Sequence, residues 1–494
     1  MNRFLYPACL LCGVFFTGCQ LEKHTGGSVS EPGKPNILLI LTDDLRADAI
    51  NCAGNSIIKT PNIDYLASNG VRFTNCYVMG NNHAAVSAPS RAMLMSGKSL
   101  FYVYDKLEGV NTMPMHFAAQ GYETFGTGKW HNTAKSFEAS FHSGKNVFLN
   151  GMSNHFRVPC QDMNEKGKLS VPMNKGYSTD LFAEAALEFL QDYIKSPMES
   201  PFFCYLSFTA PHDPRSPRED FIGMYNDEDM QLPENYLGLH PFEFDDLNGR
   251  DETLAPWPRT PGHIKATLAD YYALISHIDK RIGDIIDLLK DNDLFENTVI
   301  VFTSDNGLAV GSHGLLGKQN LYEHSAKVPL IISGKDVPKG KVTDAMVYLF
   351  DIFPTLSSLC RLPEPEGIDG EDLYPVILGK AEEVRNSIYL SYRNTVRAVR
   401  EENWKLIWYM QRKHIQLFDL ENDPDEIQNL ADIPENKERI IKMLDLIAEW
   451  HKATSDTATL FPRVTLPMEY DHTELKQIPD QYQPEYVLER YFSK

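Results

Sequence analysis

The stretch NILLILTDD, residues 36–44, decides the fold of this chain. Its apolar run is typical of a parallel strand buried on both faces, and it ends on a threonine and two aspartates. Apolar runs of strand length return at residues 202–208, 298–302 and 328–333. Helical periods lie at residues 181–194 and 266–290. This alternation predicts an α/β sheet with helices on both faces.

Polar side chains follow three of these strands at their carboxyl ends: Asp43, Asp44, His212, Asp305 and Asn306. Ligands of open α/β sheets bind beyond the carboxyl ends of the strands, so we expect these residues on one edge. The carboxylate and amide oxygens suit a hard cation such as Ca²⁺ or Mg²⁺ better than zinc. Either pair alone would favour a turn or a helix cap, whereas two pairs favour a metal site.

The chain changes character outside this alternation. Residues 213–262 are rich in Pro, Asn and acidic residues without a clear period, which predicts a long surface excursion. Short strand patterns such as SIYLSYRNTVRA (387–398) and a helical pattern at 438–452 predict a smaller α+β domain. We therefore expect a main catalytic domain over 35–380 and a smaller subdomain over 381–494.

Composition excludes one class of partner. The chain has 494 residues, 43% of them hydrophobic and 23% charged, with a formal net charge of −20. This composition is globular, and the negative charge argues against non-specific nucleic-acid binding, which requires a basic face. The five cysteines beyond the amino-terminal segment fit neither a disulfide framework nor a metal-binding spacing, although one or two bridges stay open.

The amino terminus is typical of an exported protein. Arg3 precedes a mostly apolar run at 4–16 that is too short to cross a bilayer. The following residues are similar to a bacterial lipoprotein cleavage site, so we expect a signal peptide over 1–19 with lipidation on Cys19. A simple secreted protein is the alternative. If Cys19 is lipidated, the polar stretch at 20–34 would be a linker to the lipid anchor.

Two glycine-containing motifs carry nucleophilic and basic residues. SAPSRAMLMSG begins at Ser87 and includes Arg91, and alone it is an ordinary helix start. GYETFGTGKWH holds Lys129 and His131, which would point the same way on an extended segment and could face one anion. A solvated lysine at a strand-to-loop junction is the alternative. The second motif does not match a nucleotide loop, because tryptophan follows its lysine.

Three further residues complete the set of candidates. His212 ends a strand pattern, and Lys318 lies in the stretch GSHGLLGK together with His313. A single histidine is more often structural than catalytic, and a lone lysine is usually solvated. His313 could be an alternative acid or a loop-stabilising group, and the sequence leaves both open.

Together these motifs resemble the type I formylglycine-dependent sulfatases of the alkaline-phosphatase-like superfamily. The resemblance extends from NILLILTDD through SAPSRAMLMSG, GYETFGTGKWH, SDNG and GLLGK to WKLI and LFDLENDPDEIQNLA. It implies a large, mostly parallel sheet sandwiched by helices, with a smaller carboxyl-terminal α+β domain. The S/C-x-P-S-R core carries serine here, which implies an oxygen-independent, sulfatase-maturing radical enzyme as a partner, in an anaerobic or facultative bacterium.

The resemblance also implies a role for each polar residue. Ser87 becomes formylglycine (3-oxoalanine), whose hydrate attacks sulfur with one hydroxyl and releases sulfate when the other loses its proton. Residue 87 and four side chains contact Ca²⁺: Asp43, Asp44, Asp305 and Asn306. Arg91 holds the hydrate, and Lys129 and Lys318 bind sulfate oxygens. His212, with Lys318, protonates the leaving alcohol, and His131 takes the proton of the second hydroxyl.

In its predicted export, lipidation and calcium site, the chain resembles the polysaccharide-degrading sulfatases of gut anaerobes. This implies an exo-acting enzyme on sulfated sugars of glycosaminoglycans or mucin glycans, in the periplasm or on the outer membrane of a Gram-negative anaerobe. We hypothesise a sugar subsite of basic residues that would bind a uronate or sulfated sugar, formed by His155, Arg157, Arg215 and Arg393. Surface salt bridges or loop anchoring are alternatives for each of them.

Two other functions stay open. A phosphatase or phosphodiesterase of the same superfamily would share the fold, but the S-x-P-S-R core and the lysine pair favour a sulfatase. A tethered glycan-binding protein would result if Ser87 were never matured. Sulfate release by matured protein, and its loss in Ser87→Ala, would distinguish an enzyme from a binding protein.

Overall fold

The computed structural model describes residues 33–195 and 200–492. The predicted signal peptide with Cys19, and the linker up to residue 32, lie outside the described residues. The described residues from 35 onward form one compact unit. In the described ranges no helix is both long enough and apolar enough to cross a membrane. The cysteines of these ranges form no disulfide with one another.

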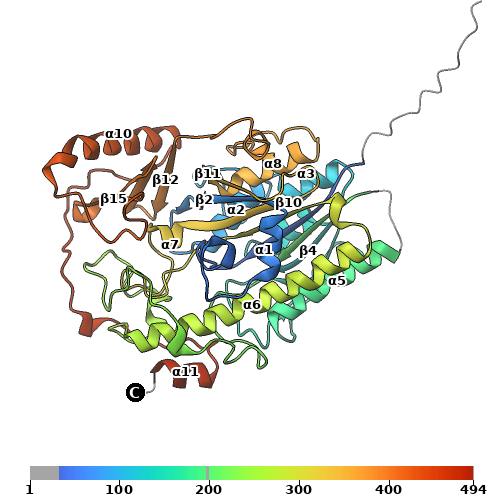
Figure 1. The fold of residues 1–494 in the computed structure, drawn as a ribbon, viewed down its shortest axis with the longest axis horizontal. Coiled ribbons are helices and arrows are strands. Elements are labelled where there is room, and N and C mark those ends of the chain that lie inside the picture. Colours follow the sequence, from blue (N-terminus) through green and yellow to red (C-terminus); the bar gives the residue numbers. More distant parts are fainter. Residues whose placement is uncertain (1–32, 196–199, 493–494) are drawn as a thin grey trace, which may run out of the picture. The chain divides into compact units, whose positions relative to one another are not determined.

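A large sheet runs through this unit (Figure 1). β1 (Asn36–Thr42) pairs in parallel with β8 (Phe202–Ser207) on one side and β9 (Thr298–Ser304) on the other. The spatial order of the strands is β11 (Lys341–Tyr348), β2 (Gly70–Tyr77), β10 (Lys327–Gly334), β9, β1, β8, β4 (Glu123–Lys129) and β5 (Ser143–Phe148).

The predicted strand at 328–333 is present as β10, but it runs antiparallel to both of its neighbours, β9 and β2. All other pairs in this sheet are parallel. The connection from β9 to β10 contains only the four-residue helix α7 (Glu323–Ala326). Parallel neighbours are usually joined by a full helix that crosses one face of the sheet, and this connection contains no such helix, which fits the antiparallel return.

Alternate residues of β1 point to opposite faces of the sheet, and helices cover both faces (Figure 1). Leu38 and Ile40 belong to one core and Ile37 and Leu39 to another. The first core includes side chains of α1 (Pro61–Ser68), α5 (Ser178–Lys195) and α6 (Pro261–Asp291). The second includes side chains of α2 (Ser87–Ser96), α3 (Met113–Ala119) and α8 (Ile352–Leu359). The expected α/β architecture is therefore confirmed.

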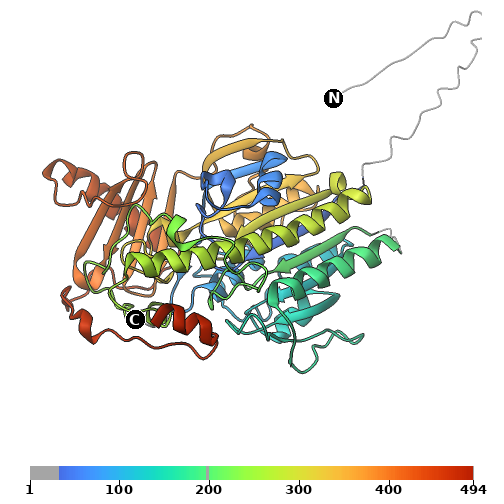
Figure 2. The same cartoon turned by 60° about the horizontal axis from the view of Figure 1, so that its bottom comes forward.

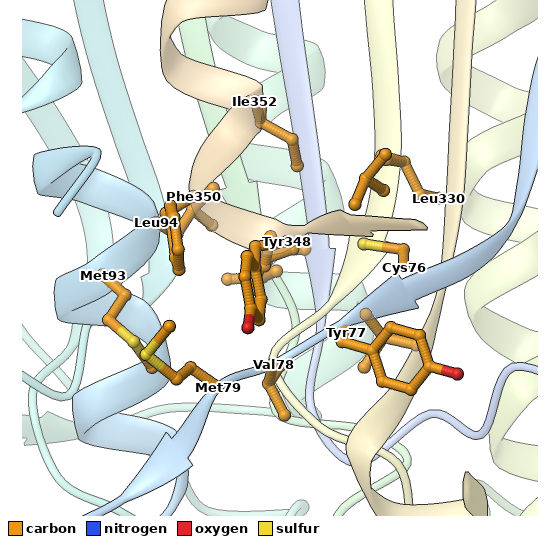
Figure 3. Close-up of a cluster of buried hydrophobic side chains, with 14 of the residues drawn as sticks. Cys76, Tyr77, Val78, Met79, Met93, Leu94, Leu330, Tyr348, Phe350 and Ile352 are labelled. Atoms are coloured by element: carbon orange, nitrogen blue, oxygen red, sulfur yellow. The ribbon is translucent and has the colours of Figure 1, made fainter. Parts of the chain in front are cut away.

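The second core anchors the helix that starts at Ser87. Figure 3 shows Met93 and Leu94 of α2 beside Met79 and Phe350, and all four side chains are at most 2% exposed. Burial of such side chains contributes about 1.5–3 kcal/mol each. The apolar face of α2 is thus fixed on the sheet, which sets the position of its first turn.

A smaller antiparallel sheet forms the carboxyl-terminal domain, as expected. Its order is β15 (His414–Asp419), β14 (Trp404–Tyr409), β13 (Val396–Glu401) and β12 (Ser387–Tyr392), with β3 (Gly80–Asn81) parallel to β12 at the edge. The helix α10 (Lys437–Ala453) buries Met443 and Ile447 against this sheet. Because β3 comes from the main domain, the domain boundary at residue 380 stays a prediction.

The remaining α-helices and strands of the described ranges are short: α4 (Ala134–Ser140), α9 (Tyr374–Ile377), α11 (Glu485–Phe492) and the paired strands β6 (Pro159–Cys160) and β7 (Met173–Asn174). The excursion at 213–262 contains two short 3-10 helices, Asp227–Asp229 and Glu252–Leu254. After α10 the chain returns to the main domain, where α11 lies beside α6 (Figure 2), and Tyr491 donates to Asp270 Oδ2 at 3.1 Å.

Candidate active site

Four neighbouring parallel strands, β9, β1, β8 and β4, end at the same edge of the sheet. Asp305 follows β9, Asp43 follows β1, His212 follows β8 and Lys129 ends β4. All four residues are at most 5% exposed. The expectation that the polar strand ends meet is therefore confirmed, and the physical reason is that the carboxyl ends of parallel strands share one edge.

Asp44 adopts a left-handed backbone conformation directly after β1, with φ 65°. Aspartate tolerates this conformation better than most residues. The Asp44 N–H donates to Asp305 Oδ1 at 3.2 Å, and the hydroxyl of Tyr271 on α6 donates to the Asp44 carbonyl at 2.6 Å. The turn is thereby held from the next strand and from a helix.

The first two turns of α2 bring Ser87 and Arg91 to this edge, because residues i and i+4 share one helix face. Arg91 is fully buried, and its Nε donates to Asp305 Oδ2 at 2.7 Å. Its Nη1 donates to the Lys129 carbonyl and to Ser207 Oγ, each at 2.7 Å. Arg91 thus connects the ends of β9, β4 and β8.

Ser87 lies among charged groups. Its Oγ is 3.3 Å from Asp43 Oδ1 and 3.3 Å from Lys318 Nζ. The Lys318 ammonium donates to both carboxylate oxygens of Asp44, at 2.6 and 2.7 Å, and the Lys129 ammonium contacts Asp43. The residues predicted from the SAPSRAMLMSG and GLLGK motifs therefore meet at one point.

The sequence predicted that Lys129 and His131 lie on one extended segment, but the structure shows that His131 does not. β4 ends at Lys129, and His131 has φ 64°, so the two-residue alternation does not apply to this pair. The imidazole is partly buried beside Gly151, and its buried Nδ1 has no hydrogen-bond partner among the described residues. Burial and the charges of Lys129 and Arg91 hold the pKa of His131 well below its usual value.

The carboxylates at this edge have different affinities for a proton. Burial raises the pKa of Asp43 and of Asp44 above the ordinary carboxyl value, although nearby lysines oppose this effect. Burial also acts on Asp305, but the charges of Arg91 and Lys129 outweigh it and lower its pKa to about 2. Asp305 is therefore the most firmly ionised of the three.

Part of this cluster fits a metal ion. Within the described ranges, Asp43, Asp44 and His212 form a group whose ligand atoms lie within 4.8 Å of one another. Asn306 is fully buried, and both of its side-chain polar atoms lack a hydrogen-bond partner in the described structure. A buried amide oxygen without a donor needs a partner, and a hard cation among carboxylates would supply one. The predicted oxygen ligands are consistent with Ca²⁺.

His212 is oriented by its neighbour. Its Nδ1 lies 2.8 Å from the Asp213 carbonyl and 3.3 Å from Asp213 Oδ1, and its Nε2 lies 3.7 Å from Asp44 Oδ2. His313 has another role, because its ring stacks on Tyr322 at 3.9 Å between centroids. Of the two readings left open for His313, the loop-stabilising one fits these contacts.

The four predicted sugar-subsite residues are placed differently from one another. Arg157 is exposed, and the Arg393 guanidinium donates to Asp246 Oδ1 at 3.0 Å. Arg215 is 2% exposed, and its buried Nε has no hydrogen-bond partner within the described residues. Whether these three arginines contact the substrate therefore stays a prediction.

The contacts of His155 do not fit the predicted role in the sugar subsite. Its Nδ1 lies 2.8 Å from Ser178 Oγ and its Nε2 lies 3.0 Å from the His212 carbonyl, so both ring nitrogens are already paired within the protein. The side chain is 1% exposed. His155 supports the backbone of the candidate acid and has no nitrogen left for a sugar.

Sequence reasoning missed several residues that organise the site. Tyr205 and Ser207 bind Arg91 from β8, and Asp213 and Arg250 lie behind His212. Asp213 is adjacent to the candidate histidine in sequence, which was an available signal. Arg250 comes from the aperiodic excursion, where no local pattern distinguishes one charged residue from another.

The sheet, its two helical layers and the charged carboxyl edge define a hydrolase with the alkaline-phosphatase-like fold. The Sulfatase family matches residues 35–361, and the family N-sulphoglucosamine sulphohydrolase, C-terminal, matches residues 311–453. The chain belongs to the sulfatase family and is a sulfuric ester hydrolase.

Relatives with established names agree with this family. An arylsulfatase of Clostridium perfringens is 30% identical over 473 residues, covering 82% of this chain and 92% of the relative. An N-acetylglucosamine-6-O-sulfatase of Bacteroides thetaiotaomicron is 26% identical over 509 residues, covering 86% of this chain and 88% of the relative.

Solved structures agree with the fold. A complex of one protein with its substrate D-glucosamine-2-N,6-O-disulfate has a TM-score of 0.72 at 23% identity, covering 86% of this chain and 99% of that chain. The phosphonate monoester hydrolase of Agrobacterium radiobacter has a TM-score of 0.68 at 21% identity, covering 85% and 96%. The fold alone thus serves more than one reaction.

Proposed function

We propose that this sulfatase hydrolyses sulfate esters on sugars at the ends of glycosaminoglycan or mucin glycan chains, using a formylglycine made from Ser87 and Ca²⁺. The observation that carries the proposal is the position of Ser87. Its Oγ lies 3.3 Å from both Asp43 Oδ1 and Lys318 Nζ, at the start of α2. A nucleophile there is next to both the cations and the metal-binding oxygens that a sulfate group needs.

Ser87 would first be oxidised by an anaerobic sulfatase-maturing radical enzyme, because an unmodified serine would form a sulfate ester with no easy exit. The hydrated aldehyde would supply one hydroxyl that attacks sulfur and displaces the sugar oxygen, and a second whose deprotonation would expel sulfate and regenerate the aldehyde. Arg91 lies one helical turn from residue 87 and is held by Asp305, so it would keep residue 87 in place.

Four oxygen-bearing side chains would hold the calcium ion: Asp43, Asp44, Asp305 and Asn306. Bound Ca²⁺ neutralises negative charge and orients the sulfate for in-line attack. The ammonium groups of Lys129 and Lys318 would bind sulfate oxygens, which is supported by their burial beside Ser87 and the carboxylates. An acidic protein thereby gains a locally cationic pocket.

Two histidines and Lys318 would move the protons. His212 presents Nε2 to the site, because its Nδ1 faces Asp213, and would protonate the leaving sugar oxygen together with Lys318. His131 would take the proton of the second hydroxyl. That role is supported by its buried Nδ1, which lacks a partner among the described residues.

A sugar substrate is supported by the names of the relatives and by a cavity next to the site. Asn306 and Lys318 line this small cavity together with Tyr392 of the small sheet. Tyr392 precedes Arg393, so the carboxyl-terminal domain would contribute to the sugar subsite. Arg157, Arg215 and Arg393 would bind a carboxylate or a second sulfate on the sugar.

The proposal includes a location as a lipoprotein, held through Cys19 in the periplasm or on the outer membrane of an anaerobic Gram-negative bacterium. Its support is the amino-terminal sequence alone. In the native host, Cys19→Ala should move the protein from the membrane fraction to the soluble fraction. Retention in the membrane fraction would contradict lipidation at this residue.

The function is tested by sulfate release from defined sulfated mono- and disaccharides, with protein coexpressed with a maturing enzyme. Ser87→Ala should abolish release, and mass spectrometry of active protein should find residue 87 lacking the two hydrogens that oxidation removes. Activity with both hydrogens still present would overturn the mechanism. Tight glycan binding without turnover would favour a binding protein, and faster hydrolysis of phosphodiesters or phosphonate monoesters would favour a phosphodiesterase.

A further inference from the structure

Three consecutive residues of the long excursion, Arg250, Asp251 and Glu252, contact the segments that carry His212 and Lys318. They lie at the start of the short helix Glu252–Leu254. Asp251 and Glu252 are 7% and 2% exposed, and the Arg250 side chain is 29% exposed. Buried charges cost free energy unless they are paired, so their partners indicate what this turn does.

Arg250 holds Asp213, which in turn orients His212. The guanidinium donates from Nη1 to Asp213 Oδ1 at 2.8 Å and from Nη2 to Oδ2, the two-pronged geometry of a strong pair. Asp213 presents two acceptors to His212 Nδ1, its carbonyl at 2.8 Å and Oδ1 at 3.3 Å. Nδ1 therefore carries the hydrogen, and Nε2 is left to face the site.

The same turn fixes the segment of Lys318. The Glu252 carboxylate accepts from the backbone N–H groups of residues 316 and 317, at 2.8 and 2.7 Å. Asp251 Oδ2 accepts from Gln319 Nε2 at 2.8 Å, and Gln319 Oε1 accepts from the Lys318 N–H at 3.0 Å. The residues on both sides of Lys318 are thus held by this one turn.

The carboxyl-terminal segment, which follows α10, contacts the turn at residues 250–252 from its outer side. After α10 the chain runs back to the main domain (Figures 1 and 2), and Asp480 Oδ2 accepts from Arg250 Nε at 2.9 Å and from Nη2 at 2.8 Å. The backbone N–H groups of residues 476 and 478 donate to the excursion on either side of Arg250, at 2.9 and 3.0 Å. Asp213, Asp251 and Asp480 together occupy all three nitrogens of the Arg250 guanidinium.

We propose that Arg250 and Asp480 are positioning residues that orient His212 for protonation of the departing oxygen. The carboxyl-terminal segment thereby controls the leaving-group step, although it supplies no reacting atom. This inference rests on the proposed role of His212 as the leaving-group acid.

A positioning role predicts a selective defect. A good leaving group such as 4-nitrophenolate departs with little help from a proton, whereas phenolate or a sugar alkoxide depends on the acid. Loss of the Asp480 carboxylate removes an ion-pair partner of Arg250, so the guanidinium is held less firmly against Asp213. The rate of hydrolysis should therefore fall most for substrates with poor leaving groups. General damage to the fold or to the metal site would slow all substrates equally.

The experiment compares matured wild-type protein with Asp480→Asn on 4-nitrophenyl sulfate and phenyl sulfate. We expect kcat/KM to fall about 10- to 100-fold for phenyl sulfate and less than about threefold for 4-nitrophenyl sulfate. Asp480→Glu keeps the carboxylate and should recover most of the phenyl sulfate activity. Arg250→Met should show the same selective loss more strongly, with thermal unfolding checked for every variant.

The matched control is Asp227→Asn, which removes a contact of Arg490 in the same carboxyl-terminal segment without touching Arg250. It should leave both substrates unchanged. An equal loss on both substrates in Asp480→Asn, or behaviour identical to Asp227→Asn, would overturn the inference.

His212→Ala separates this inference from the proposed function. A leaving-group-dependent loss in His212→Ala with none in Asp480→Asn would overturn the positioning role alone. A loss in His212→Ala that is the same for both substrates would instead overturn the role proposed for His212.

Discussion

Each buried carboxylate at the carboxyl edge of the sheet has a buried cation beside it: Asp43 with Lys129, Asp44 with Lys318, and Asp305 with Arg91. Buried charges are costly unless they are paired and hydrogen-bonded, and these three pairs meet that requirement. An incoming sulfate would compete with the carboxylates for these cations, and a divalent cation would take over the carboxylates. The same six side chains can therefore serve both ligands.

At the scale of single residues, we predict that Asn306 contributes to calcium binding. Ca²⁺ added to EDTA-treated protein should raise Tm, because a ligand that binds only the folded state stabilises it by about 1.4 kcal/mol for each tenfold excess over Kd. Asn306→Ala should change the metal-free Tm little, since the amide has no partner in the described structure, but should reduce the calcium-induced rise by roughly half or more. Thermal unfolding measures both effects. An unchanged calcium response in Asn306→Ala would place the ion elsewhere.

We also predict that Arg215 and Arg393 bind the sugar. Hydrogen bonds to a charged group contribute about 1.5–3 kcal/mol, so each alanine variant should lower kcat/KM on the true glycan by roughly 10-fold or more. Activity on 4-nitrophenyl sulfate, which lacks the sugar, should change much less. Arg361→Ala, which removes an exposed pair with Asp336, is the control. Unchanged kcat/KM on the glycan would show that the predicted subsite is wrong.

At the scale of elements, β4 must approach β8 closely before Lys129 can reach Asp43. Gly128 has φ +87°, and a Cβ at this position would collide with the carbonyl oxygen of Ser207. The register of β4 with β5 also shifts between residues 126 and 128. The strand thus ends with an irregular step that only glycine permits.

We predict that Gly128→Ala destabilises the protein by at least about 3 kcal/mol, because strained backbone and a backbone collision add together. Gly121→Ala is the matched control. Gly121 has φ +86° but open space around its Cβ position, so this variant should cost only about 1 kcal/mol. Urea unfolding measures the two free energies. Equal values for the two variants would contradict a close approach of β4 to β8.

At the scale of the whole unit, buried ion pairs connect the small sheet to the large one. Lys405 of β14 is fully buried, and its ammonium lies 2.9 Å from Glu323 and 2.8 Å from Glu426. Glu323 belongs to α7, directly after the segment that carries Lys318. The position of the small sheet is therefore tied to the chain that forms the active site.

We predict that Lys405→Met destabilises the protein by about 3–5 kcal/mol, because it removes the buried cation that Glu323 and Glu426 share. The double variant Lys405→Met with Glu426→Gln should recover part of this loss, since it removes one of the uncompensated charges. The exposed Lys442, which pairs with Glu401, offers a control whose loss should cost less than about 1 kcal/mol. Urea unfolding distinguishes these cases, and a Lys405→Met as stable as the Lys442 control would contradict the coupling.

Local patterns were enough to predict the architecture and the core of the site. The run at residues 36–44 identified a buried parallel strand, and the polar residues after three such strands indicated a shared edge. These signals are short-range: periodicity reports which faces are buried, and the chemistry of a few neighbouring side chains reports what a strand end can bind. Ser87 and Arg91 were identified differently, through the resemblance of SAPSRAMLMSG to the sulfatases, because this motif alone is an ordinary helix start.

Contacts between distant segments had no such signal. Arg250 and Asp480 are 230 residues apart in the chain, and neither lies in a periodic or motif-bearing stretch. The antiparallel direction of β10, the supporting role of His155 and the pairing of β3 with β12 likewise depend on which segments meet in space. By itself, the sequence of this sulfatase determined the sheet and the residues of its reactive edge. Only the tertiary structure decided what holds those residues in place, because orientation depends on long-range packing and hydrogen bonds that leave no local pattern.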